Sequence, residues 1–204
     1  MTDVLRTLAP LLLPDPLWTS LAAGYASSPR WYHTLDHIAA VARQANAIAD
    51  WERPREVFLA VLYHDVVYDV TRSDNEARSA EQARRAIATW LPDAGIDADR
   101  VAELLLATAR HGRLAPGDVD HDLGLFLDCD MAVLGAEPHE YDVYAEGVRR
   151  EYLTALPVEV YDAGRKAFLT TVVDAPRLFL SERFHKALDG HARANLRREL
   201  AVLG

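Results

Sequence analysis

The sequence predicts an all-α fold, formed as a single helical domain over residues 1–204. Apolar side chains recur at the three- and four-residue spacing of helices. Strands that alternate apolar and polar residues and meet at tight hairpin turns are missing. Half of the residues are hydrophobic, and no linker long enough to divide the chain is visible, so we expect one packed core.

Prolines and glycines mark the ends of the expected helices. Pro14 and Pro16 keep the first two helices short. Pro54 begins the fourth helix, and Gly95 and Gly112 follow the ends of later ones. We expect helices over residues 5–13, 16–26, 34–50, 55–68, 76–90, 97–111, 120–134, 138–155, 158–173 and 185–203, with polar loops over 70–75 and 113–119.

Composition limits the classes of partner. The formal net charge of −9 argues against general nucleic-acid binding through a basic surface. The single cysteine, Cys129, excludes an internal disulfide and fits a reducing cytoplasm. No signal peptide is evident, and no apolar run approaches the roughly 20 residues that span a bilayer. We therefore expect a cytoplasmic protein with no membrane partner.

A histidine and an aspartate, His64 and Asp65, stand side by side in an apolar run that begins at Phe58. Burying an ionised carboxylate is costly unless it is paired or binds a metal. Adjacent helix residues diverge by about 100°, so these two side chains pair poorly with each other but can converge on one ion. A buried structural His-Asp pair is the alternative.

Two further histidines, His33 and His37, are four residues apart and share one face of the helix expected over 34–50. Val41 and Ile48 continue that face, which directs both histidines toward the apolar side. Both can bind a metal, or one can bind while the other donates a proton. A hydrogen-bonded pair at a helix start is the alternative.

Two carboxylates, Asp128 and Asp130, lie within a later apolar run. Asp130 falls on the stripe that includes Leu123 and Met131, whereas Asp128 lies off it. We therefore expect Asp130 to be the metal ligand. For Asp128 we expect either contact with a ligand histidine or exposure to solvent.

Polar residues close to the expected site offer further chemistry. Asp69 and Glu76 follow the buried helix and can orient or activate a water. His111 precedes Gly112 at a helix end. Its position suits a helix cap, a phosphate contact or a ligand of a second metal.

The ordered set of His37, His64-Asp65 and Asp130 resembles the HD superfamily of metal-dependent phosphohydrolases. Further short sequence motifs are similar to those of a bacterial branch of that superfamily, and together they cover most of the chain. They are Tyr32-His33, Tyr68-Asp69, Asn75-Glu76-x-x-Ser79-Ala80, Thr108-x-x-His111, Leu134-Gly135, Arg149-x-Glu151-Tyr152, Gly164-Arg165 and Ala192-Arg193-x-Asn195-Leu196.

The resemblance implies an HD-type helical bundle with one divalent ion, or two, per chain. His37, His64, Asp65 and Asp130 are the implied metal ligands, and Asn75 and His111 the implied substrate contacts. The His33-x-x-x-His37 text is also similar to cyclic-nucleotide phosphodiesterases, which implies that His33 donates a proton to the leaving group. Asp69 and Glu76 would complete the catalytic set. Manganese, iron, zinc, magnesium, cobalt and nickel all suit such ligands.

We expect hydrolysis of a phosphate ester, from a nucleotide or another small phosphorylated metabolite. Two alternatives stay open, since fold does not fix reaction. One is oxygen chemistry at a di-iron HD site, and the other is a non-catalytic HD module that senses a nucleotide or a metal. The C-terminal helices are compatible with a homodimer, although no heptad repeat specifies one.

Overall fold

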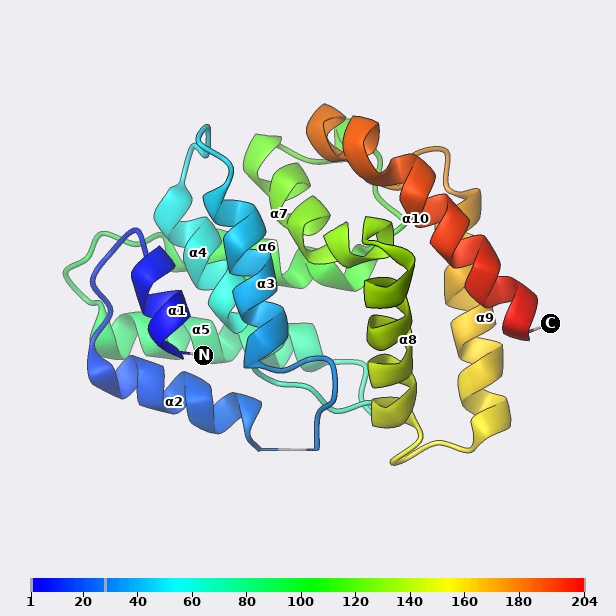
Figure 1. Ribbon diagram of the computed structural model, residues 1–204. Coiled ribbons are helices and arrows are strands. Elements are labelled where there is room, and N and C mark those ends of the chain that lie inside the picture. Colours follow the sequence, from blue (N-terminus) through cyan, green and yellow to red (C-terminus); the bar gives the residue numbers. More distant parts are fainter. Residues whose placement is uncertain (1, 28, 204) are drawn as a thin grey trace. The chain divides into compact units, whose positions relative to one another are not determined.

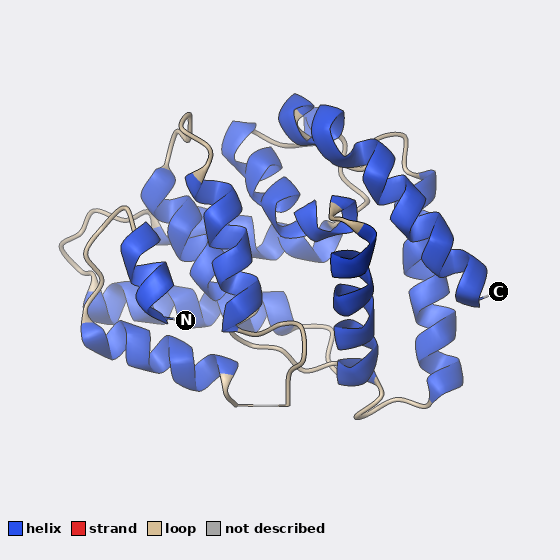
Figure 2. Ribbon diagram, in the orientation of Figure 1, coloured by secondary structure: helices blue, strands red, loops and turns tan. Residues whose placement is uncertain are grey.

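The computed structural model describes residues 2–27 and 29–203, and within them every regular element is a helix (Figures 1 and 2). This confirms the all-α prediction. The described residues form two compact units, one ending at Ala109 and the other beginning at Arg110. That residues 1–204 act as a single domain stays a prediction. None of the described helices is both long and apolar enough to cross a membrane.

The first unit contains six α-helices. They are α1 (Thr2–Leu8), α2 (Asp15–Tyr25), α3 (Leu35–Asn46), α4 (Pro54–Tyr63), α5 (Asn75–Trp90) and α6 (Ala98–Ala107). The short 3₁₀ helix η1 (Thr108–Arg110) lies at the boundary between the units. Figure 1 shows α3 and α4 adjacent, and α4 also packs against α5 and α6.

Helix α4 is the centre of the first unit, because every residue from Glu56 to Tyr63 is buried. A helix that is apolar on all sides can only lie in a core. Its one buried charge, Glu56, accepts a hydrogen bond from the backbone N–H of Asp97 at 3.2 Å. That contact joins the start of α4 to the start of α6.

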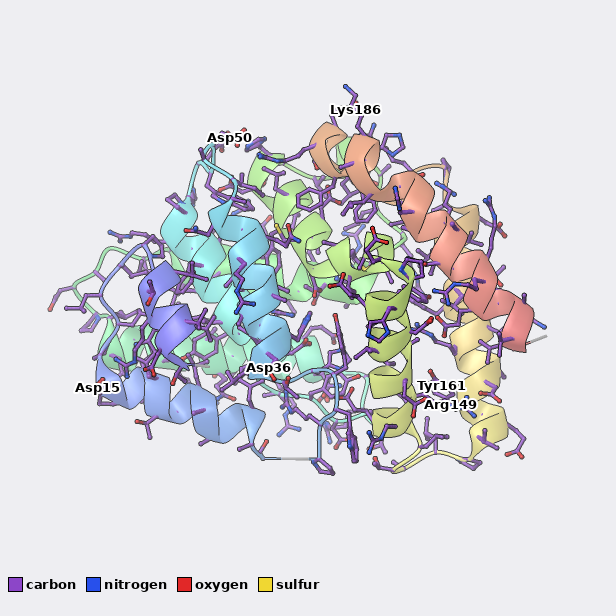
Figure 3. All side chains as sticks on the ribbon, viewed as in Figure 1. Asp15, Asp36, Asp50, Arg149, Tyr161 and Lys186 are labelled. Carbon is purple, nitrogen blue, oxygen red and sulfur yellow. The ribbon has the colours of Figure 1, made fainter. Side chains whose placement is uncertain are left out.

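The second unit contains the remaining helices. They are η2 (Pro116–Asp118), α7 (His121–Met131), η3 (Ala132–Gly135), α8 (Pro138–Tyr152), α9 (Val158–Asp174) and α10 (Glu182–Leu203). Arg165 on α9 is buried and connects three of them. Its guanidinium donates to the Glu199 carboxylate on α10 at 2.8 and 3.0 Å and to the Tyr144 hydroxyl on α8 at 3.1 Å. The guanidinium of the half-buried Arg149 on α8 lies over the ring of the buried Tyr161 on α9, and both side chains are labelled in Figure 3.

Several predicted helices end earlier in the structure than expected, among them those expected over 5–13, 97–111, 120–134 and 138–155, which end at Leu8, Ala107, Met131 and Tyr152. The helix expected over 34–50 ends at Asn46, and the one expected over 55–68 ends at Tyr63, with His64 as its C-cap. The difference at Tyr63 matters for function, because His64 and Asp65 lie at the end of α4 and not inside it. Gly112 has a φ of 71°, the left-handed conformation expected of a glycine after a helix end.

Asn195 should be a stability determinant of the second unit. It is buried on α10, and its Nδ2 donates to the carbonyls of Leu134 at 3.0 Å and Ala136 at 2.9 Å. Asn195→Ala leaves both carbonyls without this donor, so we expect a loss of about 1–3 kcal/mol in the free energy of unfolding, measured by urea denaturation. Asn46→Ala, at an exposed position, is the control; equal effects of the two substitutions would contradict the assignment.

Candidate metal centre

Three ligand-type atoms converge in the first unit. The Nε2 atoms of His37 and His64 are 3.1 Å apart, and Asp65 Oδ2 lies 3.5 Å from the first and 3.1 Å from the second. Both imidazoles are buried, whereas the Asp65 side chain keeps 19% of its surface exposed. The cluster can hold a metal ion and is accessible on its carboxylate side.

Local structure presents each donor. Thr34 is the N-cap of α3, and its Oγ1 accepts from the Asp36 N–H at 3.2 Å, which fixes the helix start just before His37. At the end of α4, His64 Nδ1 lies 3.0 Å from the Val61 carbonyl. Since a carbonyl only accepts, Nδ1 carries a proton, and Nε2 is the nitrogen that faces Asp65 Oδ2 at 3.1 Å; it would present its lone pair to a bound ion after losing its own proton.

The separations fit a single divalent ion. Ligand distances of about 2.1 Å place two ligand atoms about 3.0 Å apart at right angles and about 3.4 Å apart at tetrahedral angles. The observed values of 3.1, 3.1 and 3.5 Å are close to these. A circle through the three donor atoms has a radius of about 1.9 Å. A metal ion placed slightly out of the plane of these atoms would therefore lie about 2.1 Å from each of them, a normal ligand distance.

The charge on Asp65 also suits a ligand. Burial alone raises the pKa of its carboxyl, but the charges of His64 and His33 and hydrogen bonds from His37 and His64 outweigh burial and hold that pKa well below its usual range. Asp65 is therefore ionised at neutral pH, which metal binding requires.

His33 lies beside the cluster without belonging to it. Its ring stacks on Tyr68 with centroids 4.0 Å apart, and it meets the His37 ring edge-on at 5.9 Å. The side chain is half-buried, whereas His37 is buried. The two histidines therefore differ in burial and in their ring contacts, and the proton-donor role of His33 stays a prediction.

The residues after α4 form a hydrogen-bonded loop. Asp69 Oδ1 accepts from the N–H and the hydroxyl of Thr71 at 2.9 and 2.6 Å, and these bonds lower the pKa of Asp69. The Asn75 amide accepts from the Asp69 N–H at 3.1 Å and donates to its carbonyl at 2.9 Å. Glu76 lies half-buried in the first turn of α5. The catalytic roles of Asp69 and Glu76 and the substrate contact of Asn75 stay predictions.

Asp130 and His111 form a pair within the second unit. Asp130 Oδ2 is 2.9 Å from His111 Nε2, and the side chains are 15% and 18% exposed. Such a contact occurs both in structural hydrogen-bonded pairs and between residues that bind a metal ion. The assignments of Asp130 as the fourth metal ligand and of His111 as a substrate contact stay predictions.

Asp128 corrects the expectation for the second carboxylate. It is buried, and its two carboxylate oxygens accept from the backbone N–H groups of Leu180 and Ser181, both at 2.7 Å. Asp128 therefore neither faces solvent nor orients a histidine through these bonds; it holds the segment that leads into α10. The prediction that Asp130 faces the core and Asp128 does not was wrong for Asp128. Helix α7 is buried at every position from Asp122 to Cys129, so no single apolar face distinguishes the two carboxylates.

Arg30 is a residue near the site to which the sequence analysis assigned no role. Its guanidinium donates to the backbone carbonyls of His33 and Asp65. It precedes α3 in an irregular segment, where helical periodicity gives no information. Its position three residues before His33 is the one signal that could have drawn attention to it.

His64→Ala tests the site directly. The substitution removes one of three donor atoms, so we expect affinity for a divalent ion to fall by on the order of 100-fold or more, with the helical spectrum retained. Calorimetric titration of the metal-free protein with Co²⁺, together with elemental analysis, measures this. His191→Ala, at an exposed position on α10, should bind as the wild type does. Unchanged binding by His64→Ala would exclude this cluster.

Comparison of the chain with protein-family models, with curated protein sequences and with solved structures gives no significant match.

Proposed function

We propose that this chain is a metal-dependent phosphohydrolase of the HD type, acting on a nucleotide or another small phosphorylated metabolite. The observation that supports this proposal is the convergence of His37 Nε2, His64 Nε2 and Asp65 Oδ2 on one point. These residues occur in the His…His-Asp order that resembles the HD superfamily. A donor set of imidazoles and a carboxylate suits several divalent ions.

A bound divalent ion supplies a water of lowered pKa and polarises a phosphoryl oxygen. The remaining contributions come from side chains. His37, His64 and Asp65 provide three protein ligands, which leaves coordination positions for water and substrate. The exposed side of Asp65 gives a phosphate access to this point.

His33 is the proposed proton donor to the leaving oxygen. It lies beside His37 and is half-buried, so its ring is accessible to a substrate bound at the cluster. Stacking on Tyr68 restrains the plane of the imidazole. A positioned histidine contributes about 10²–10⁴-fold to rate when the leaving group needs a proton.

Asp65→Asn tests hydrolysis. Wild-type protein loaded separately with each candidate ion is screened for phosphate release from nucleotides and for cleavage of p-nitrophenyl phosphate and bis-p-nitrophenyl phosphate. Asparagine is nearly isosteric but neutral, so we expect weak metal binding and at least about 100-fold slower turnover with unchanged helicity. Asp93→Asn, an exposed position after α5, is the control and should keep full activity.

Three results would contradict the proposal. One is full metal content and turnover in Asp65→Asn. Metal binding without turnover of any phosphate ester would favour a sensing module. Two irons per chain with consumption of oxygen would favour the oxygenase class.

His33→Gln tests the proton donor. We expect unchanged metal content and a fall in kcat of about 10²–10⁴-fold for an ester with an alkoxide leaving group. The loss should be much smaller for p-nitrophenyl phosphate, because p-nitrophenolate leaves without protonation. Equal losses on both substrates would refute the role, and a parallel loss of metal would assign His33 to the ligand set.

A further inference from the structure

The backbone at the end of α4 carries two of the three donors, and its carbonyls have an unusual set of partners. The last carbonyls of a helix have no partner within it and must find donors elsewhere. The His64 N–H donates to Ala60 O at 2.9 Å, and the Val66 N–H donates to Tyr63 O at 3.2 Å. His64 Nδ1 donates to Val61 O at 3.0 Å.

Side chains from α2 and from the segment before α3 donate to one carbonyl in the last turn of α4 and to two just beyond it. The Tyr25 hydroxyl donates to Leu62 O at 2.9 Å. Arg30 Nη1 donates to Asp65 O at 2.6 Å, and Arg30 Nη2 donates to Val66 O at 3.1 Å. A cation at this position is also favoured by the helix dipole.

The same guanidinium reaches the segment that carries the histidines before α3. Arg30 Nη1 donates to His33 O at 3.0 Å, and Nη2 contacts Gly24 O at 3.3 Å. The rings of Tyr25 and Tyr68 lie 5.0 and 5.7 Å from its central carbon, within cation–π range. Arg30 therefore connects the backbones of His33 and Asp65.

The packing around this guanidinium is close. A Cβ added to Gly24 would lie 2.6 Å from Val66 Cγ2, so α2 approaches the Asp65–Val66 segment as near as a glycine allows. That approach lets one side chain serve Gly24, His33 and Asp65 together.

We propose that Arg30 is a positioning residue for the metal centre, and this inference rests on the proposed metal binding at His37, His64 and Asp65. Arg30 acts through the backbone carbonyls of His33 and Asp65. It raises the metal affinity by holding the Asp65 backbone at a fixed position relative to the segment before α3. The same guanidinium also positions His33 by its hydrogen bond to the His33 carbonyl.

The chemistry requires arginine at this position. A guanidinium is planar and presents donors in two directions at once, whereas a lysine ammonium is a single point charge. Arg30 uses Nη1 for the carbonyls of His33 and Asp65 and Nη2 for those of Gly24 and Val66. Arg30→Lys keeps the charge but has one nitrogen in place of two, so it cannot serve all four carbonyls. Outer groups that orient metal ligands affect metal affinity by about 10–100-fold, and we expect a loss of that size.

The experiment uses Co²⁺ as the probe with the metal-free full chain. Calorimetry gives the dissociation constants of wild type, Arg30→Lys and Arg30→Ala, and the visible d–d absorption of bound Co²⁺ reports ligand geometry. We expect weaker binding and an altered spectrum in both variants, with partial recovery in Arg30→Ala on adding millimolar guanidinium. Arg72→Lys is the matched control, since Arg72 makes a two-point contact with Asp74 in an exposed loop. It should leave both readouts unchanged.

The outcomes separate this inference from the proposed function. If the wild type binds no Co²⁺, the metal centre itself is wrong, and the role of Arg30 is wrong with it. If the wild type binds Co²⁺ and the Arg30 variants match it in affinity and spectrum, the inference is overturned while the metal centre stands. If both variants lose the native far-UV spectrum, Arg30 stabilises the fold generally, and the specific role is rejected.

Discussion

The end of α4 at Tyr63 is the constraint on which the candidate metal centre depends. Within a continuous helix, the side chains of His64 and Asp65 would point about 100° apart. In the structure His64 keeps helical backbone angles as the C-cap (φ −59°, ψ −35°), and His64 Nε2 and Asp65 Oδ2 still meet at 3.1 Å. Two neighbouring residues at the end of the helix thus direct their donor atoms at one point.

Because α4 lies in the core, the carbonyl groups at its end would destabilise the fold if they had no hydrogen-bond donors. All residues from Glu56 to Tyr63 are buried, so unpaired carbonyls at the end of α4 could not turn to water without penalty. The Tyr25 hydroxyl donates to Leu62 O in the last turn, and Arg30 donates to Asp65 O and Val66 O just beyond it. The side chains that donate to these carbonyls and the two metal ligands His64 and Asp65 thus lie at the same place, the C-terminal end of α4.

The sequence predicted the helical class and the clustering of His37, His64 and Asp65, because these depend on local periodicity and on the cost of burying polar groups. It did not predict the end of α4, since the groups that cap it, Tyr25 and Arg30, lie more than thirty residues earlier in the chain. The error at Asp128 has a similar origin. Local pattern cannot distinguish two carboxylates on a helix buried on most sides, and the backbone N–H partners of Asp128 come from 52 and 53 residues further on.

His64 links the fold to the chemistry through one hydrogen bond. Its Nδ1 donates to Val61 O, a carbonyl that the helix itself leaves unpaired. The same hydrogen bond orients the ring so that Nε2 faces His37 and Asp65, where it would present its lone pair to a bound ion after losing its own proton. Any change that extended α4 by a turn would give Val61 O a backbone partner and release the His64 ring. The state in which α4 is correctly terminated is therefore the state in which His64 can bind a metal, and a bound ion would in turn stabilise that termination.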